Sequence, residues 1–203
     1  MTVGSPTTTG GRAPNLRYTC LQDVMTRFPE TVDFPTAPCP AGIMAIHHFP
    51  ACWDGKNLDS PNHQDHMYYS GTGGFVAHGA CPASHPVRMP HIALETMWDT
   101  RPFNDRSLWP TDGSQPFVWS YGDAKGYGTH ADYVFGWKGD ALQRTMDSRA
   151  LLSDGLKTQA VDAANRCTIS ATVREDVDGC ELLLISCFLP NRSRGWVVFW
   201  ARN

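Results

Sequence analysis

Glycine and proline interrupt residues 50–90 so often that no long helix or strand fits there. Proline fixes φ and removes a backbone donor, and glycine favours turns, so each such residue tends to end a regular element. This segment is therefore predicted to consist of loops that join very short strands. The interruptions fall at Pro50, Gly55, Pro61, Gly71, Gly73, Gly74, Gly79, Pro82, Pro86 and Pro90.

The composition of the whole chain favours the same kind of fold. Only 18% of the 203 residues are charged, aromatic residues reach 11%, and there are 18 glycines and 15 prolines. A helix bundle would be richer in Ala, Glu, Lys and Leu. We therefore predict a mainly β, sandwich-like fold or an irregular α+β fold, as one loop-rich domain with one or two short helices.

The charge of the chain argues against two classes of partner. The formal net charge is -3, and no long basic block is present. Nucleic acid and anionic membrane surfaces are recognised mainly through clustered Lys and Arg, so neither is expected as a partner. No apolar stretch approaches the ~20 residues of a membrane-spanning helix.

Seven cysteines are present, and none of them forms a Cys-x-x-Cys pair. Zinc ribbons and thioredoxin-like motifs are therefore not expected. Cys20, Cys39, Cys52 and Cys81 are well separated and lie beside turn residues, a pattern typical of disulfides in secreted domains. The chain begins with neither a charged nor an apolar leader segment. We therefore predict an extracellular protein whose sequence starts inside a longer precursor.

Periodicity predicts a small number of regular elements. Apolar content and alternation indicate strands. An acidic residue followed by an apolar stripe indicates a helix, here with Asp140 as its cap and Gln143 at the capping-box position. Residues 1–15 are expected to be a flexible lead-in. The predicted strands are 43–49, 91–99, 117–121 and 130–137, and the predicted helices are 140–149, with an inner stripe at Leu142 and Met146, and 160–165.

The last part of the chain differs from the rest. Residues 180–203 change abruptly in character after Gly179. They are expected either to form a terminal hairpin or not to belong to the domain. The predicted division is thus a domain over 1–179 and a divergent tail over 180–203.

Histidines gather on glycine- and proline-bounded turns, where preorganised sites are common. His63 and His66 are three residues apart, and His85 lies between Cys81 and prolines. On a strand, His130 and Asp132 would project to one face, as a shared metal site or an acid–base pair requires. We predict that a divalent metal ion could be held by His63, His66, His85 and His130. The alternative is that these side chains only order loops.

Carboxylates and aromatic rings supply the other candidates. Glu95 and Asp99 would share one side of a strand or a helical turn and, with His130 and Asp132, form the candidate catalytic set. The alternative for Asp99 is a capped turn at a strand end. Aromatic rings could stack on sugars, although most would be buried in the core. The candidate ligand-binding residues are Trp53, Asp54, Lys56, Asp123 and Tyr127, and the further candidate stacking rings are Trp98, Trp109 and Trp137.

Three stretches carry a resemblance to a known family. They are HFPACWDGKNLDSPNHQDH at 48–66, CPASHPVRMP at 81–90 and GDAKGYGTHADY at 122–133. In this order they resemble the fungal secreted family DUF1996, over residues 1 to about 179. The resemblance implies an extracellular fungal protein and gives no established reaction. The chain departs from the family's pattern upstream, where further histidines are usual, near Arg149, and from Cys180 onward.

These features lead to one functional expectation and its rivals. We expect action on cell-wall polysaccharide by hydrolysis, with water activated by a metal or base and one carboxyl protonating the leaving oxygen. The rival is a non-catalytic protein that binds wall glycan, and a third alternative is a nonfunctional fragment. Titratable groups that converge in one cleft would favour the enzyme, whereas aromatic rings with scattered histidines would favour the binder.

Overall fold

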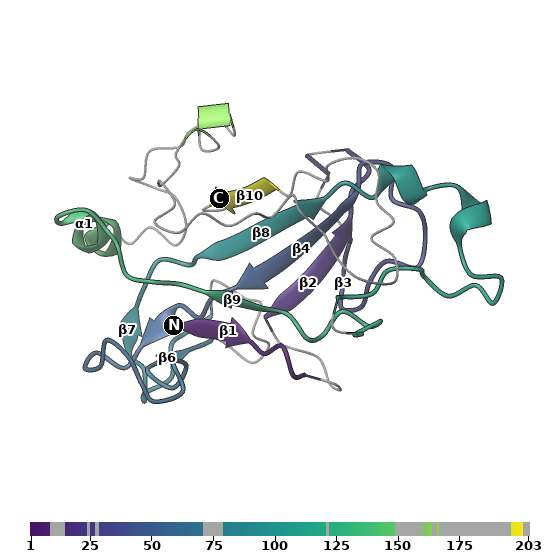
Figure 1. The fold of residues 1–203 in the computed structure, drawn as a ribbon. Helices are drawn as coiled ribbons and strands as arrows, with labels where there is room; N and C mark the ends of the chain where they lie inside the picture. The colour runs from purple at the N-terminus through teal and green to yellow at the C-terminus, as the bar shows by residue number, and fades with distance from the viewer. Residues whose placement is uncertain are drawn as a thin grey trace, which may run out of the picture.

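The computed structural model describes residues 1–8, 15–23, 25–26, 29–70, 79–120, 122–148, 160, 162–163, 166 and, for the backbone alone, 196–200. Its main feature is an antiparallel sheet with the strand order β10-β8-β4-β2-β3 (Figure 1). The prediction of a mainly β, loop-rich domain is confirmed. The strands of this sheet are β2 (Leu16–Cys20), β3 (Glu30–Thr31), β4 (Ile43–His48), β8 (Ala93–Trp98) and β10 (Trp196–Trp200).

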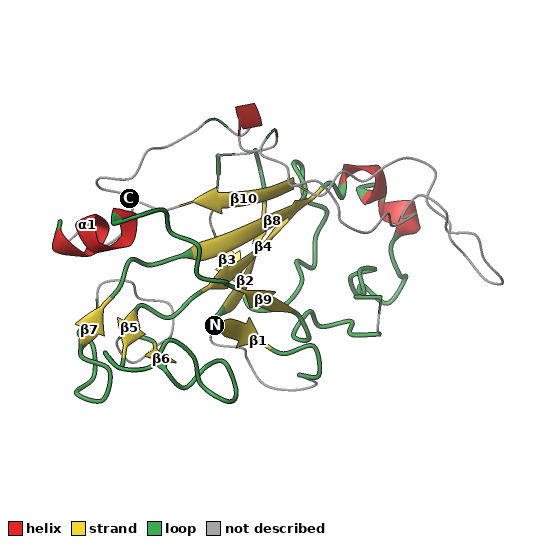
Figure 2. Cartoon of the chain, turned by 60° about the vertical axis from the view of Figure 1, so that its left-hand side comes forward, coloured by secondary structure: helices red, strands yellow, loops and turns green. Residues whose placement is uncertain are grey.

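Smaller elements surround this central sheet. One two-stranded sheet pairs β1 (Thr2–Gly4) with β9 (His130–Asp132), and a three-stranded sheet has the order β6-β5-β7. The helix α1 lies at the same end of the molecule as the three-stranded sheet in both views (Figure 1, Figure 2). Their bounds are β5 (Cys52–Trp53), β6 (Met67–Tyr68), β7 (Val87–Arg88), α1 (Ala141–Asp147) and the 3-10 helices η1 (Arg101–Phe103) and η2 (Arg106–Leu108).

Strand β4 forms the centre of the core, and all six of its residues are buried. Successive side chains point to opposite faces, so burial of all six means that the sheet is covered on both faces. On one face Met44 and Ile46 pack with Leu21 and Ala93. On the other face Ile43 and Ala45 join a second apolar cluster that includes Tyr18, Leu16, Phe34 and Cys39.

The loop that follows Phe117 covers the second of these faces. The Tyr18 hydroxyl donates to the Gly126 carbonyl at 2.6 Å, and the Phe34 ring lies between Tyr18 and Trp119 at centroid distances of 4.8 and 5.6 Å. Gly126 has a φ of +90°, and a Cβ there would lie 2.7 Å from the Tyr18 hydroxyl oxygen. Glycine is therefore required both by the backbone conformation and by the close approach.

Strands β1 and β9 continue this cover. Val3 pairs with Ala131, and both side chains pack with Phe49 in a third apolar cluster. The prediction that residues 1–15 form a flexible lead-in is wrong for Thr2–Gly4, which form β1. The apolar Val3 gains burial against Phe49, which favours an ordered strand over a free lead-in.

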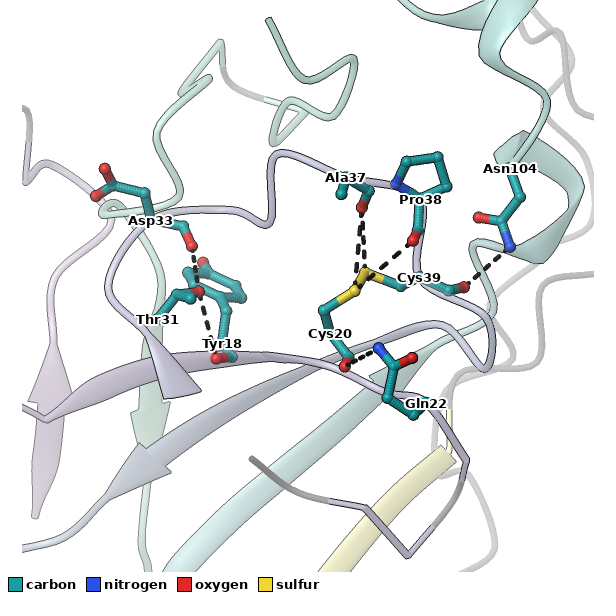
Figure 3. Close-up of a disulfide and its surroundings, with 9 residues drawn as sticks. All are labelled: Tyr18, Cys20, Gln22, Thr31, Asp33, Ala37, Pro38, Cys39 and Asn104. Atoms are coloured by element: carbon teal, nitrogen blue, oxygen red, sulfur yellow. Dashed lines mark hydrogen bonds between the residues drawn. A yellow bond between two sulfur atoms is a disulfide. The ribbon is translucent and has the colours of Figure 1, made fainter. Parts of the chain in front are cut away.

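Two disulfides join the loops to the sheets. Cys20 at the end of β2 bonds to Cys39, which precedes β4, and Cys52 in β5 bonds to Cys81 in the loop before β7. Figure 3 shows the first of these, where the Asn104 amide also donates to the Cys39 carbonyl at 3.0 Å. The sequence prediction that these four cysteines form disulfides is confirmed. Such links are compatible with an extracellular protein.

The predicted strands are confirmed in part. Strands β4 and β8 lie where 43–49 and 91–99 were predicted, and β9 occupies only the first residues of 130–137. The strand predicted at 117–121 is wrong over 117–120, the part of it that the structure describes. There the Gln115 amide donates to the Phe117 and Ala124 carbonyls, and the Trp119 N–H bonds within the turn. These bonds within the loop take the place of the backbone hydrogen bonds that a β-strand would make with a neighbouring strand.

The predicted helix at 140–149 is present as α1, but its start differs from the prediction. The Asp140 side chain makes no capping hydrogen bond and instead contacts Arg144. Gln143 donates to Asp147, four residues later, rather than back toward the cap. Asp162 and Ala163 are helical, within the second predicted helix.

The backbone of 196–200 pairs with β8 as β10, while the rest of the predicted 180–203 tail lies outside the described residues. In the described part of the chain, no helix has the length and apolar character needed to cross a membrane.

The buried His47 makes the stability of the fold depend on pH. Burial and the neighbouring His130 lower its pKa from 6.5 to about 4, against a smaller opposing effect of the Thr129 backbone. Between these values the unfolded chain binds a proton that the folded chain excludes, so stability falls as the pH falls. Acidification from 6.5 to 4 is expected to cost roughly 3 kcal/mol through this residue.

The measurement is urea unfolding at several pH values across this window. His47→Gln keeps a polar side chain but cannot take up the proton, so its stability should change less on acidification than that of the unaltered protein. Parallel pH profiles for the two proteins would show that His47 is not the group responsible.

Candidate ligand-binding cleft

The histidines predicted to bind a metal lie in different settings. His63 and His66 occupy the loop between β5 and β6, His85 precedes β7, and His130 begins β9. Among the described residues, no group of three or more His, Cys, Asp or Glu side chains is placed to hold a metal ion. The structure therefore does not gather the four predicted ligands around a common ion.

Two of these histidines bond to neighbouring parts of the chain, one within its own loop and one across to another loop. The Nδ1 atom of His63, a residue with a φ of +57°, lies 2.8 Å from an Asp59 carboxylate oxygen. His85 has Nδ1 3.0 Å from the Ser84 hydroxyl and Nε2 2.9 Å from the Asp65 carbonyl, and its ring stacks on Tyr68. Both nitrogens of His85 thus have partners within the chain, so a metal could bind only by displacing one of them.

His130 and Asp132 are brought together as the strand alternation predicted. The His130 Nε2 lies 3.3 Å from Asp132 Oδ2, and the two side chains are 43% and 56% exposed. The Thr2 hydroxyl of the partner strand β1 donates to Asp132 Oδ1 at 2.7 Å. This geometry orients a carboxylate and an imidazole at the surface, outside the cleft described below.

Glu95 and Asp99 do not form an accessible pair of acids. Glu95 is completely buried in β8, whereas Asp99 lies beyond the end of that strand and is partly exposed. Arg101 donates to both Asp99 oxygens at 2.7 Å, and these bonds lower the pKa of Asp99. The strand ends before Asp99, so the alternation assumed from sequence does not extend to it.

Asp54 uses its carboxylate to close a turn. It accepts backbone N–H groups from Lys56 and Asn57 at 2.8 and 2.9 Å, and these bonds lower its pKa to about 2. The Trp53 indole N–H donates to the Asn57 carbonyl of the same turn at 2.7 Å. Lys56 is exposed at the turn. The turn therefore holds the Trp53 ring, and the residue is half-buried.

Asp123 has a similar role in the loop that covers the central sheet. Its oxygens accept the backbone N–H groups of Lys125, Gly126 and Gly128 at 2.8, 3.0 and 2.6 Å. Partial burial acts to raise the pKa of Asp123, but these backbone bonds together lower it below the ordinary value. The neighbouring Tyr127 hydroxyl donates to Asp33. Both side chains order the loop.

A cleft of about 460 Å³ lies beside these turns, and this volume is in the range of small-molecule sites. Its walls come from the strands and loops around β5, from residues 133–139 and from α1. Apolar and aromatic side chains dominate. The lining residues are Met1, Pro50, Trp53, Leu58, His66, Met67, Met89, Pro90, Ile92, Tyr133, Phe135, Trp137, Gly139, Asp140, Leu142, Gln143 and Met146.

The cleft contains few of the residues that the sequence predicted for a site. Trp53 and His66 line it, as does Trp137. Leu142 and Met146, which the sequence assigned to an inner helical stripe, face this open volume, whereas Thr145 is the buried residue of α1. An apolar stripe has the same period whether it meets a core or a cleft, so periodicity alone could not distinguish them.

These features define a disulfide-bonded, β-rich domain with an apolar cleft at one end of its central sheet. A family model described as a domain of unknown function, DUF1996, matches residues 1–137. The chain belongs to this family. No curated protein and no solved structure matches it. The matched segment ends at Trp137, so α1 lies beyond it.

Replacing Asp123 by Ala should destabilise the loop across the central sheet. Three backbone N–H groups would lose a charged acceptor, and we expect the free energy of unfolding to fall by about 2 kcal/mol. Asp112→Ala is the matched control, because Asp112 accepts a backbone N–H from Ser114 in an exposed turn. Equal losses for the two variants, measured by thermal unfolding, would contradict this role of Asp123.

Proposed function

We propose that this chain is an extracellular, non-catalytic domain that binds cell-wall polysaccharide in the apolar cleft. The observation that carries the proposal is the set of aromatic rings around one open volume: Trp53, Tyr133, Phe135 and Trp137 all line it. Sugar rings present flat C–H faces that stack on such side chains, while their hydroxyls remain in water. The disulfides support an extracellular location.

The two tryptophans are held ready for stacking. The Trp53 N–H donates to the Asn57 carbonyl, and the Trp137 N–H donates to the Tyr133 hydroxyl at 2.5 Å. Each indole therefore satisfies its polar atom within the protein. Fixed rings lose little conformational entropy on binding, which favours affinity for a ligand that contacts their faces.

The charged groups favour binding over hydrolysis. A glycosidase of the usual kind needs two carboxyls on either side of the scissile bond. Among the described residues that line the cleft, the one carboxylate is Asp140, which is paired with Arg144. The buried Glu95 and the paired Asp99 do not line it. An aromatic cleft with dispersed histidines is the arrangement expected of a binder.

A hydrolase remains the second candidate because His130 and Asp132 form an exposed pair at 3.3 Å. An oriented imidazole and carboxylate could activate water. Release of new reducing ends from wall polysaccharide by the unaltered protein, with loss of this release in His130→Ala, would support hydrolysis and overturn the non-catalytic proposal.

Removal of either stacking ring should weaken binding to oligosaccharides. For Trp53→Ala and Trp137→Ala we expect a loss of about tenfold in affinity each, since an aromatic contact contributes on the order of 1 kcal/mol beyond its buried area. Isothermal titration with soluble fragments of chitin and of β-glucan measures the effect.

Trp98→Ala is the matched control, because Trp98 is partly exposed, packs on Trp119 and does not line the cleft. Its affinity should equal that of the unaltered protein. Equal losses in all three variants, or full affinity in both cleft variants, would contradict the proposed binding surface.

A further inference from the structure

The hydrogen bonds around His66 fix which of its ring nitrogens carries the proton. The Asn62 side-chain oxygen accepts the backbone N–H groups of Gln64 and Asp65 at 3.1 and 3.0 Å, which identifies this atom as the amide oxygen. The Ser60 hydroxyl donates its single hydrogen to that oxygen at 3.1 Å. The 2.9 Å contact between Ser60 Oγ and His66 Nδ1 must therefore have Nδ1–H as the donor.

This tautomer leaves Nε2 of His66 as an acceptor. A neutral imidazole with a proton on Nδ1 has a lone pair on Nε2. The residue is only 5% exposed, lines the cleft, and makes no hydrogen bond through Nε2 to any described residue. Burial, the largest effect, lowers the pKa of His66 and keeps the ring neutral near pH 7. This residue of the cleft wall thus has an acceptor nitrogen that no described residue uses.

The apolar lining of the cleft restricts which ligand groups could donate a hydrogen bond to His66 Nε2. Met67, Met89 and Ile92 line the same cleft, together with the Trp53 ring. A matching ligand carries an N–H or O–H donor directly beside a small apolar group.

We propose that the cleft selects N-acetylated amino-sugar chains over plain glucans, with His66 Nε2 accepting the acetamido N–H and the apolar side chains contacting the acetyl methyl. This inference rests on the proposed function and names the substrate class of the same cleft. An acetamido group joins a neutral N–H donor to a methyl group through one carbonyl. A glucan hydroxyl supplies a donor but no methyl, and a deacetylated amino sugar lacks the acetyl methyl.

The experiment compares two ligands of equal length, the tetrasaccharide of N-acetylglucosamine and cellotetraose, by isothermal titration at pH 7.5. The unaltered protein should bind the acetylated ligand at least tenfold more tightly. His66→Phe keeps an aromatic ring but removes the acceptor, and should lose about tenfold in affinity for the acetylated ligand. His66→Gln restores an acceptor and should recover part of that loss. Circular dichroism checks that both variants are folded.

The possible outcomes separate this inference from the proposed function. Equal affinity of the unaltered protein for the two ligands would overturn the selection but leave glycan binding intact. An equal loss for both ligands in His66→Phe, with no recovery in His66→Gln, would show that His66 only supports the loop and would also overturn the inference. Failure of the unaltered protein to bind either ligand, or the β-glucan fragments named above, would overturn the proposed function together with the inference.

Discussion

The burial of β4 on both faces is the constraint on which the rest of the structure depends. An antiparallel sheet often leaves one face in water, but here every β4 side chain is enclosed. The apolar run at 43–46 can be buried only if other segments cover the second face. The loop after Phe117 and the β1–β9 pair provide that cover. The order of the loop comes from backbone bonds to Asp123 and from the close contact of Tyr18 with Gly126.

The cleft is a consequence of how the chain leaves this core. Beyond Phe49 the chain turns into β5, where Cys52 is bonded to Cys81 and the Asp54 turn fixes Trp53. On the other side, residues 133–139 leave β9 without forming a strand and lead into α1. Apolar side chains that would fill a core in a continuous sheet therefore meet across an open space. Disulfide-bonded loops on one side and a short helix on the other give this space its shape.

The sequence predicted the elements whose pattern is local and missed those that depend on distant partners. The strands at Ile43–His48 and Ala93–Trp98, the helix and the four disulfide cysteines follow from periodicity and spacing. The turn roles of Asp54 and Asp123 were missed, although Asp followed by Lys, Asn or Gly is a recognisable turn signal. The separation of the histidines and the position of the cleft depend on tertiary packing, which neither alternation nor motif spacing encodes.

The boundary of the family match at Trp137 divides the cleft between two kinds of sequence. The disulfide-bonded loops and aromatic residues that form most of its wall lie inside the matched segment, whereas Leu142, Gln143 and Met146 lie outside it. Helix α1 contributes a single buried residue, Thr145. Substitutions of its cleft-facing side chains should therefore reshape one wall of the cleft with little penalty to the central sheet.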